Sequence, residues 1–281
     1  MTIGRIGLAY NPTIEAAIDL RERAAGWCAV RGIDHWAAAA GDLDELLIEL
    51  PSSDVLVVLG GDGTFLRAAR AVAEIDVPIL GINLGKVGFL SKVEAHELEA
   101  ILGQIVAGGY AIEERMALRA TVLPGGRDGM GESFLALNDV VVARGSLARV
   151  CRLDVAIGES HLATFVADGL VVASPTGSTG YSFSAGGPIL DPTSRNLIVT
   201  PIAGYLSAIR SVVVSPRHTV SCRVIDAHEA LVSIDGREDR PLRVGDVVNV
   251  EAFERSIRFV EPHGRPPFWD LLRQKVELLP S

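Results

Sequence analysis

Val57-Val58-Leu59-Gly60-Gly61-Asp62-Gly63-Thr64 is the stretch that decides how the first part of the chain folds. An apolar run breaks into three glycines around one carboxylate, and an alanine-rich helical pattern follows from Thr64 to about residue 73. Because glycine has no Cβ, a phosphate can closely approach the backbone N–H groups of such a turn. A helix N-terminus adds partial positive charge, and Thr64 is placed to cap it. The stretch therefore predicts a strand, a tight turn and a helix that together bind phosphate.

Asp62 is the unexpected residue in this turn, because an unpartnered carboxylate repels phosphate. Its placement suggests two roles, accepting a proton from a hydroxyl nucleophile or holding Mg²⁺. A plain surface turn is the alternative, since Asp and Gly are common in turns. The stretch is not a Walker motif, because no Gly-Lys-Ser/Thr follows, and it lacks the Gly-x-Gly-x-x-Gly spacing of a dinucleotide turn.

Composition limits the classes of protein that fit. The 281 residues are 48% hydrophobic, enough for two domains with separate cores. The net charge of −9 argues against binding to nucleic acid or to an anionic membrane surface. Three widely spaced cysteines and six histidines without ligand spacing predict neither a disulfide framework nor a zinc site. Without a signal peptide, or an apolar run of roughly 18 residues, we expect a soluble, cytoplasmic protein with no membrane partner.

Strand and helix patterns alternate in the first third of the chain, as in a parallel sheet covered by helices. The patterns predict strands at 3–10, 54–59 and 77–82, and helices at 13–31, 43–50, 64–73 and 95–107. A second glycine-rich loop, Gly81 to Ser91, follows the third strand and carries Lys86, another candidate functional residue. The apolar face of a helix at 268–278 predicts packing back on this domain. We therefore expect a Rossmann-like α/β domain at 1–110, joined by 265–281.

Residues 111–264 show a different pattern, with short strands and turns at roughly ten-residue intervals. This pattern predicts an all-β, sandwich-like second domain. The candidate strands are 117–123, 135–143, 151–157, 169–173, 196–201, 219–225, 230–234, 247–252 and 257–260.

Two polar segments interrupt these strands. Ser174 to Pro188 is rich in Gly, Ser and Thr, which supply hydrogen-bonding groups and leave room for a planar ligand, with Tyr181 able to stack on it. A long flexible loop is the alternative. Asn138-Asp139 lies inside an apolar strand, where such residues are unfavourable, and this placement suggests a bulge or a site.

Over almost its whole length the chain resembles the NAD kinase family. Three motifs carry the resemblance: Gly60 to Thr64, Gly81 to Ser91, and Ser174 to Pro188. The first alone is weak, since diacylglycerol and sphingosine kinases and phosphofructokinases have similar turns, but the second and third together are specific. The resemblance implies phosphorylation of the adenosine ribose 2′-hydroxyl of NAD, with ATP or polyphosphate as donor and a divalent metal, Mg²⁺. It also implies a homo-oligomer, a dimer or a tetramer.

The resemblance also implies roles for particular residues. Asp62 matches the family's catalytic carboxylate, and Asn138-Asp139 matches the pair that reads the nicotinamide side of the ligand. No residue is assigned as a metal ligand. The expected dinucleotide-binding residues are Gly61, Asp62, Gly63, Arg67, Asn138, Asp139, Arg149, Asp168, Thr179, Gly180, Tyr181, Ser182, Phe183 and Ser184.

Three departures from the family pattern bear on donor choice, on NAD versus NADH preference and on subunit contacts. The family usually has Ala at Gly180, Cys-Pro-His-Ser-Leu at 203–207, where this chain has Ala-Gly-Tyr-Leu-Ser, and Gln at Arg237. Two other functions stay open. A lipid kinase could share the Gly-Gly-Asp-Gly turn, although an acidic chain without a docking segment disfavours it. A non-catalytic NAD(P) sensor could use the same loops without phosphoryl transfer.

Overall fold

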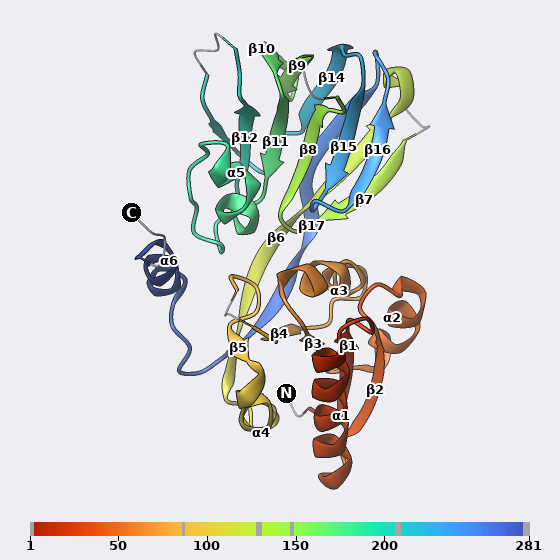
Figure 1. The fold of residues 1–281 in the computed structure, drawn as a ribbon, viewed down its shortest axis with the longest axis vertical. Helices are drawn as coiled ribbons and strands as arrows, with labels where there is room; N and C mark the ends of the chain where they lie inside the picture. Colours follow the sequence, from red (N-terminus) through yellow and green to blue (C-terminus); the bar gives the residue numbers. More distant parts are fainter. Residues whose placement is uncertain (1–2, 86–87, 128–130, 147–148, 206–208, 278–281) are drawn as a thin grey trace. The chain divides into compact units, whose positions relative to one another are not determined.

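The computed structural model of the chain describes residues 3–85, 88–127, 131–146, 149–205 and 209–277 (Figure 1). The chain forms two compact units. The first unit comprises Met1–Glu114 and Ile257–Ser281, and the second comprises Arg115–Ser256. The sequence pattern places the boundaries at 110/111 and 264/265 instead. The positions differ because two long strands, β6 (Tyr110–Leu123) and β17 (Val247–Pro262), continue from one unit into the other.

A parallel sheet forms the middle of the first unit. Its strands run in the order β4-β3-β1-β2, and both β5 and the last part of β17 pair with β4. Every residue of β3 and β4 is buried, as expected for parallel strands that are covered on both faces. The bounds are β1 (Arg5–Tyr10), β2 (Asp34–Ala39), β3 (Val55–Leu59), β4 (Ile79–Asn83) and β5 (Val93–Glu94).

Helices cover this sheet. Apolar side chains of α1 and α4 form one core with alternate residues of β1, β3 and β4, while α2 and α3 pack against each other and against strands of the same sheet. The α/β class expected from the sequence is confirmed. The bounds are α1 (Glu15–Val30), α2 (Leu43–Glu49), α3 (Asp62–Ile75), α4 (Leu98–Val106) and α6 (Phe268–Glu277), with 3₁₀ turns η1 (Leu50–Ser52) and η2 (Ala95–Glu97).

The C-terminal helix α6 belongs to the first unit, as the sequence predicts. The ring centroid of Phe268 lies 5.8 Å from that of Phe89 in the second glycine-rich loop. Just before the helix, Arg265 forms two hydrogen bonds of 2.8 and 2.9 Å to the carboxylate of Glu97. These contacts hold α6 beside the loop that follows β4.

The second unit is a sandwich of two antiparallel sheets, again as expected. One sheet has the order β13-β12-β11-β8-β15-β16, and the other contains β10-β9-β14-β17 together with β6 and β7. Their facing side chains make one large apolar core. The remaining bounds are β7 (Glu132–Ala136), β8 (Asp139–Arg144), β9 (Cys151–Ile157), β10 (Ser160–Ala167), β11 (Gly169–Ala173), β12 (Leu197–Ile202), β13 (Val212–Val214), β14 (Val220–Asp226), β15 (Ala230–Ile234) and β16 (Glu238–Leu242).

Several sequence expectations need correction. Strands β2, β5, β10, β13 and β16 are present although no strand was predicted there. The single strand predicted at 135–143 is two strands, β7 and β8, interrupted at Leu137-Asn138. The last two predicted strands of the second domain are one continuous strand, β17.

Two further features of the fold concern the cysteines and the helices. Cys28, Cys151 and Cys222 are free and buried. Among the described residues, no helix has both the length and the apolar character needed to cross a membrane.

Candidate functional site

The glycine turn after β3 is tightly packed. A Cβ on Gly60 would lie 2.7 Å from Oγ1 of Thr64, so the close approach of these residues requires glycine. The N-cap of α3 is Gly61, and the helix begins at Asp62, two residues earlier than predicted. Thr64 is therefore not the cap: it lies buried in the first helical turn, where its N–H donates to the carbonyl of Gly61 at 2.8 Å.

The carboxylate of Asp62 lies against the second glycine-rich loop. A Cβ on Gly88 would be 2.1 Å from Asp62 Oδ1, so only glycine fits there. The backbone N–H groups of Phe89, Leu90 and Ser91 donate hydrogen bonds to this carboxylate. Burial nevertheless raises the pKa of Asp62 above its usual value, because it outweighs the opposing effects of these donors and of Lys275.

One oxygen of the Asp62 carboxylate lacks a hydrogen-bond donor among the described residues. Asp62 Oδ1 is buried and has no hydrogen-bond partner among the described residues. A buried, acceptor-only oxygen without a donor is costly to a folded protein, and such atoms are often found where a ligand binds. The two glycine-rich motifs therefore meet at one carboxylate oxygen that can accept a proton.

Other predicted residues of the first unit lie along α3. Gly63 is in its first turn, and Arg67 follows one turn later, half-buried. The Cδ of Arg67 lies 3.6 Å from the position of a Cβ on Gly41, which places this side chain beside the turn that follows β2. Lys86 lies outside the described residues.

Lys275 is a residue that sequence reasoning missed. Its Nζ lies 5.1 Å from the ring centroid of Phe89, and its positive charge lowers the pKa of Asp62. The sequence of α6 shows an apolar face and gives no sign of this role. The first unit thus brings a cation from the far end of the chain toward the glycine-rich loops.

The Asn138-Asp139 pair of the second unit lies at the break between β7 and β8. The carboxylate of Asp235, at the end of β15, accepts hydrogen bonds from the backbone N–H groups of Leu137, Asn138 and Asp139 at 3.0, 2.8 and 3.1 Å. The pair therefore lies at or beside an interruption between two strands, and its role in binding stays a prediction. Burial, together with the nearby charge of Asp235, raises the pKa of Asp139 to about 7.

The segment from Ser174 to Pro188 is ordered in its first part. It forms a 3₁₀ turn, η4 (Thr176–Thr179), and one helical turn, α5 (Tyr181–Ser184). Ser174 anchors it: its N–H donates to the carbonyl of Asn138 at 2.9 Å, and its Oγ donates to the carbonyl of Leu137 at 2.5 Å.

Two glycines let this segment lie directly on the Asn138-Asp139 turn. A Cβ on Gly177 would be 2.1 Å from the carbonyl oxygen of Asn138, and one on Gly180 would be 3.8 Å from Asp139 Oδ2. Gly180, one of the predicted binding residues, therefore lies near Asp139. The binding role of this segment stays a prediction.

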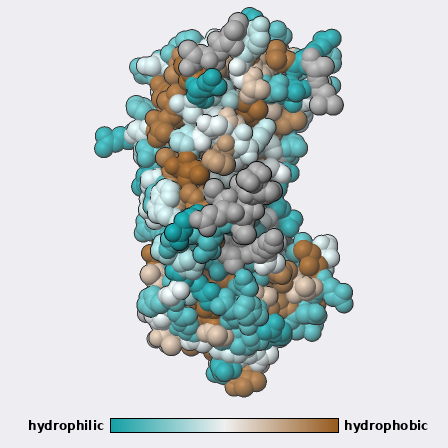
Figure 2. All heavy atoms as spheres, turned by 60° about the vertical axis from the view of Figure 1, so that its left-hand side comes forward, coloured by the Kyte–Doolittle hydropathy of each residue, from teal (hydrophilic) through white to brown (hydrophobic). Residues whose placement is uncertain are grey.

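The aromatic side chains of α5 are accessible. Tyr181 and Phe183 are 46% and 47% exposed, whereas Ser182 between them is buried. Exposed aromatic rings can stack on a planar ligand. Figure 2 shows that hydrophobic residues on the face it presents form separate patches among hydrophilic ones.

Asp168 and Arg149 differ in their surroundings. Asp168 accepts hydrogen bonds of 2.6 and 3.2 Å from Nε and a terminal nitrogen of Arg144, a bidentate ion pair that sequence reasoning missed. The second terminal nitrogen of Arg144 donates to the carbonyl of Ser146 at 2.6 Å. Arg149 is exposed, and no contact among the described residues joins it to this ion pair.

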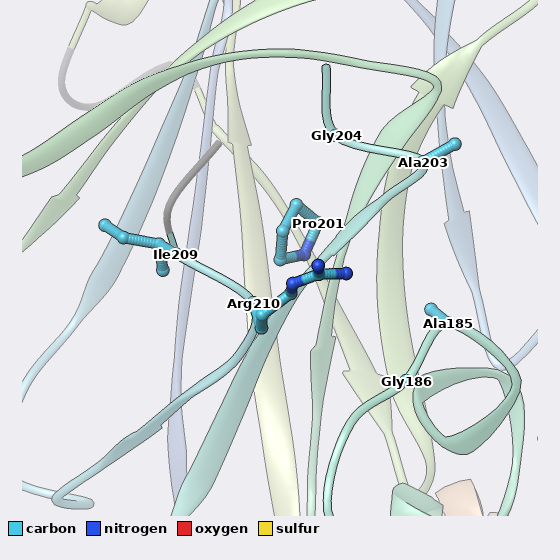
Figure 3. Close-up of a pocket in the computed structure, with 7 residues that line it drawn as sticks. All are labelled: Ala185, Gly186, Pro201, Ala203, Gly204, Ile209 and Arg210. Carbon is cyan, nitrogen blue, oxygen red and sulfur yellow. The ribbon is translucent and has the colours of Figure 1, made fainter. Parts of the chain in front are cut away.

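A cavity of about 480 Å³ opens beside α5 (Figure 3). Ala203, which has a positive φ of 47°, and Gly204 line one side of it, at the segment where the sequence departs from the family pattern. In Figure 3 the guanidinium group of Arg210 lies beside Pro201 at this cavity. The other lining residues are Ala185, Gly186 and Ile209.

Comparison with known proteins agrees with these motifs. Residues 49–110 match the ATP-NAD kinase N-terminal domain family, and residues 137–262 match the ATP-NAD kinase C-terminal domain family. An NAD kinase from Heliobacterium modesticaldum is 40% identical, over 97% of this chain and 98% of the relative. An NAD kinase from Symbiobacterium thermophilum is 44% identical, over 85% of this chain and 86% of the relative.

Solved structures show the same fold. Yeast NADH kinase complexed with NADH matches with a TM-score of 0.83 at 22% identity, covering 99% of this chain and 88% of that one. An NAD kinase from Archaeoglobus fulgidus in complex with ATP matches with a TM-score of 0.78 at 25% identity, covering 97% of this chain and 98% of that one.

Proposed function

Because the chain belongs to the NAD kinase family, we propose that Asp62 is the base that activates the adenosine ribose 2′-hydroxyl of NAD for phosphorylation. The chain is a phosphotransferase that converts NAD to NADP, and the comparisons support this function rather than a lipid kinase or a non-catalytic sensor. Phosphoryl transfer depends mainly on positioning and on charge neutralisation, so the roles of the site residues can be derived from their geometry.

The observation that carries this proposal is the state of the Asp62 carboxylate. Its pKa is raised by burial, and its Oδ1 has no hydrogen-bond donor among the described residues. A carboxylate with a raised pKa is a stronger base than an exposed one, and a free lone pair can accept the proton of a bound hydroxyl. The hydrogen bonds from the second glycine-rich loop hold the other part of the group in place.

The phosphoryl donor would bind at the N-terminus of α3. Gly61 and Gly63 lie in the N-terminal turn of this helix, where backbone N–H groups and the helix dipole favour an anion. ATP is the donor we propose, because the archaeal neighbour was solved in complex with ATP. Polyphosphate is the alternative, to be tested in the same assay.

The turn at Asp62 offers few protein ligands for a divalent metal. Among the described residues, no group of three His, Cys, Asp or Glu side chains could hold a metal ion. Mg²⁺ is commonly bound through substrate phosphates, several waters and one or two carboxylates. We therefore expect the donor phosphates and waters to hold Mg²⁺, and the ion would neutralise phosphate charge.

The second unit would bind NAD. Asn138, Asp139 and the Thr179 to Ser184 segment lie together and offer hydrogen-bonding groups beside the exposed ring of Tyr181. Asp168 is fixed by its ion pair with Arg144 and is available at the end of β10. Binding to these groups would orient the ribose hydroxyl, and most of the catalytic benefit comes from that orientation.

A coupled assay tests the proposal. Purified protein, Mg²⁺, NAD and either ATP or polyphosphate are incubated, and NADP is measured with an NADP-specific dehydrogenase. We expect Asp62→Asn to keep most NAD binding but to lose turnover by at least about 100-fold, the lower end for a positioned acid–base group. Near-normal turnover in this variant would refute the role of Asp62. NAD binding without any product in the unaltered protein would indicate a sensor instead.

Assembly and cellular location stay predictions. We propose a homo-oligomer, a dimer or a tetramer, which sedimentation of the purified protein measures. The three free, buried thiols support a reducing compartment, and we propose the cytoplasm. The net charge of −9 supports the absence of a nucleic-acid partner.

A further inference from the structure

The turn that carries Asn138 and Asp139 is held by one side chain from a distant strand. Both carboxylate oxygens of Asp235 are used: one accepts from Leu137, and the other accepts from Asn138 and Asp139. The N–H of Asp235 donates back to the carbonyl of Asp139 at 2.9 Å, which closes the connection. Without this carboxylate, three N–H groups, of which two are buried and that of Asn138 is partly buried, would lose their acceptor, a loss that costs more than an ordinary hydrogen bond contributes.

Asp235 occupies this position under constraint. It is only 7% exposed, and its φ of 52° lies in the left-handed region, which non-glycine residues rarely adopt. A carboxylate there is an acceptor with no proton to donate, and the three N–H donors match that chemistry. The constraint indicates that this side chain is placed to bind the turn.

A second buried carboxyl group lies in the same place. Asp139 is also 7% exposed, and the charge of Asp235 acts directly on it. Among the described residues, Ser174, Gly177 and Gly180 also face the turn, from the segment that follows β11, and none of these three carries a charge. Two buried carboxyl groups that share one site cannot both be charged without strong repulsion. Asp139 therefore keeps its proton up to a pH of about 7.

We propose that Asp235 is a positioning residue of the NAD site, which holds the Asn138-Asp139 turn in its binding conformation. The identity of the ligand rests on the proposed function. When Asp139 loses its proton, two carboxylates repel each other beneath the turn, and the turn loosens. NAD affinity should then fall as pH rises through neutrality.

Equilibrium binding of NAD without a phosphoryl donor tests this inference, by titration calorimetry between pH 6 and pH 8. The protonated fraction of an acid with a pKa of about 7 falls roughly tenfold over this range. We expect the Kd of the unaltered protein to rise by up to about tenfold, and that of Asp139→Asn, which cannot ionise, to stay constant. Asp235→Asn should weaken binding by at least about tenfold at pH 6, as expected for the loss of hydrogen bonds to a charged group.

Asp246→Asn is the matched control. Asp246 lies in the same unit, is 8% exposed, and accepts hydrogen bonds from the N–H groups of Gly125 and Arg243 at 2.7 and 2.8 Å. Like Asp235, Asp246 accepts hydrogen bonds from backbone N–H groups, but those groups lie outside the proposed site. We expect this variant to be less stable in thermal melting, and to keep both the NAD affinity and the pH dependence of the unaltered protein.

Three results would overturn the inference. The first is an NAD affinity of Asp235→Asn within about threefold of that of the unaltered protein. The second is a loss of NAD affinity in Asp246→Asn equal to the loss in Asp235→Asn. The third is an NAD affinity of Asp139→Asn that still depends on pH. Failure of the unaltered protein to bind NAD would overturn the proposed function, and this inference with it. Normal binding with an unaffected Asp235→Asn would overturn the inference alone.

Discussion

Replacing Asp139 with Asn should change how the stability of the protein depends on pH. Burial and the charge of Asp235 raise the pKa of Asp139 from 3.8 to about 7 in the folded chain. A raised pKa means that the folded state binds the proton more tightly than the unfolded state. Above the folded pKa the carboxyl group must therefore be charged at an unfavourable site, and it destabilises the fold there. Below the unfolded pKa both states are protonated, and this destabilisation is absent.

The size of the effect follows from the two pKa values. Each pKa unit corresponds to about 1.4 kcal/mol, so the change from 3.8 to about 7 is worth up to about 4 kcal/mol. This destabilisation develops between about pH 4 and pH 7 and is complete above pH 7. Asn has nearly the shape of the protonated acid and no charge. Relative to the unaltered protein, Asp139→Asn should therefore gain up to about 4 kcal/mol in unfolding free energy between pH 4 and pH 8.

Urea unfolding followed by far-ultraviolet circular dichroism measures this difference at several pH values. Tryptophan fluorescence is unsuitable, because Trp27, Trp36 and Trp269 all lie in the first unit. Asp246→Asn is the control: it leaves the pair of carboxyl groups intact and should keep the pH dependence of the unaltered protein. A stability difference between Asp139→Asn and the unaltered protein that stays constant from pH 5 to pH 8 would refute the reasoning.

Glycine substitutions give three further predictions. Gly88→Ala should lower kcat by at least about tenfold, because its Cβ would overlap Asp62 and displace it, whereas Gly26→Ala, with open space around it in α1, should keep full activity in the same assay. Gly177→Ala should raise the KM for NAD by at least about tenfold, because its Cβ would meet a backbone carbonyl at 2.1 Å, and a KM within about threefold would contradict this. A Cβ on Gly180 would lie 3.3 Å from its nearest neighbour, the carbonyl oxygen of Gly177, so Gly180→Ala should change the KM for NAD by less than about threefold.

The strands that the sequence predicted are those whose own residues specify a strand. The stretch at 55–59 is an unbroken apolar run of valine and leucine, and it is a strand whatever surrounds it. The missed strand β2 reads Asp-His-Trp-Ala-Ala-Ala, which contains no β-branched residue. It is a strand because its backbone pairs in parallel with β1 along six residues. Pairing of that kind is a tertiary effect that a local pattern does not contain.

The sequence pattern predicts that α3 starts at Thr64, whereas it starts at Asp62, for a related reason. A threonine before an alanine-rich run is a good N-cap by propensity, so Thr64 was the natural choice. In the fold, Thr64 is buried against Gly60, and its hydroxyl is not available for capping. Gly61 is the N-cap without any side-chain hydrogen bond. Packing between the turn and the helix therefore overrides the capping preference.

The candidate site residues were predicted from motifs and from their match to the family pattern, whereas the residues that contact them from distant parts of the chain were missed. Asp235 holds a turn 97 positions away along the chain, and Lys275 approaches Asp62 from the last helix. Arg144 pairs with Asp168 from the neighbouring strand. Aspartate, lysine and arginine are common surface residues, so nothing local distinguishes these three. Only the three-dimensional contacts identify them.

The same contacts explain why the three motifs are informative together and weak alone. Gly88 belongs to the second motif, yet the atom that forbids a side chain there is Oδ1 of Asp62 in the first motif. Gly177 belongs to the third motif, and the atom that forbids a side chain there is the carbonyl oxygen of Asn138. Each glycine is therefore required by a partner outside its own segment. A turn that merely needs flexibility could contain any one of these patterns, but a chain that contains all of them with their partners meets the packing requirements of the turns in each unit.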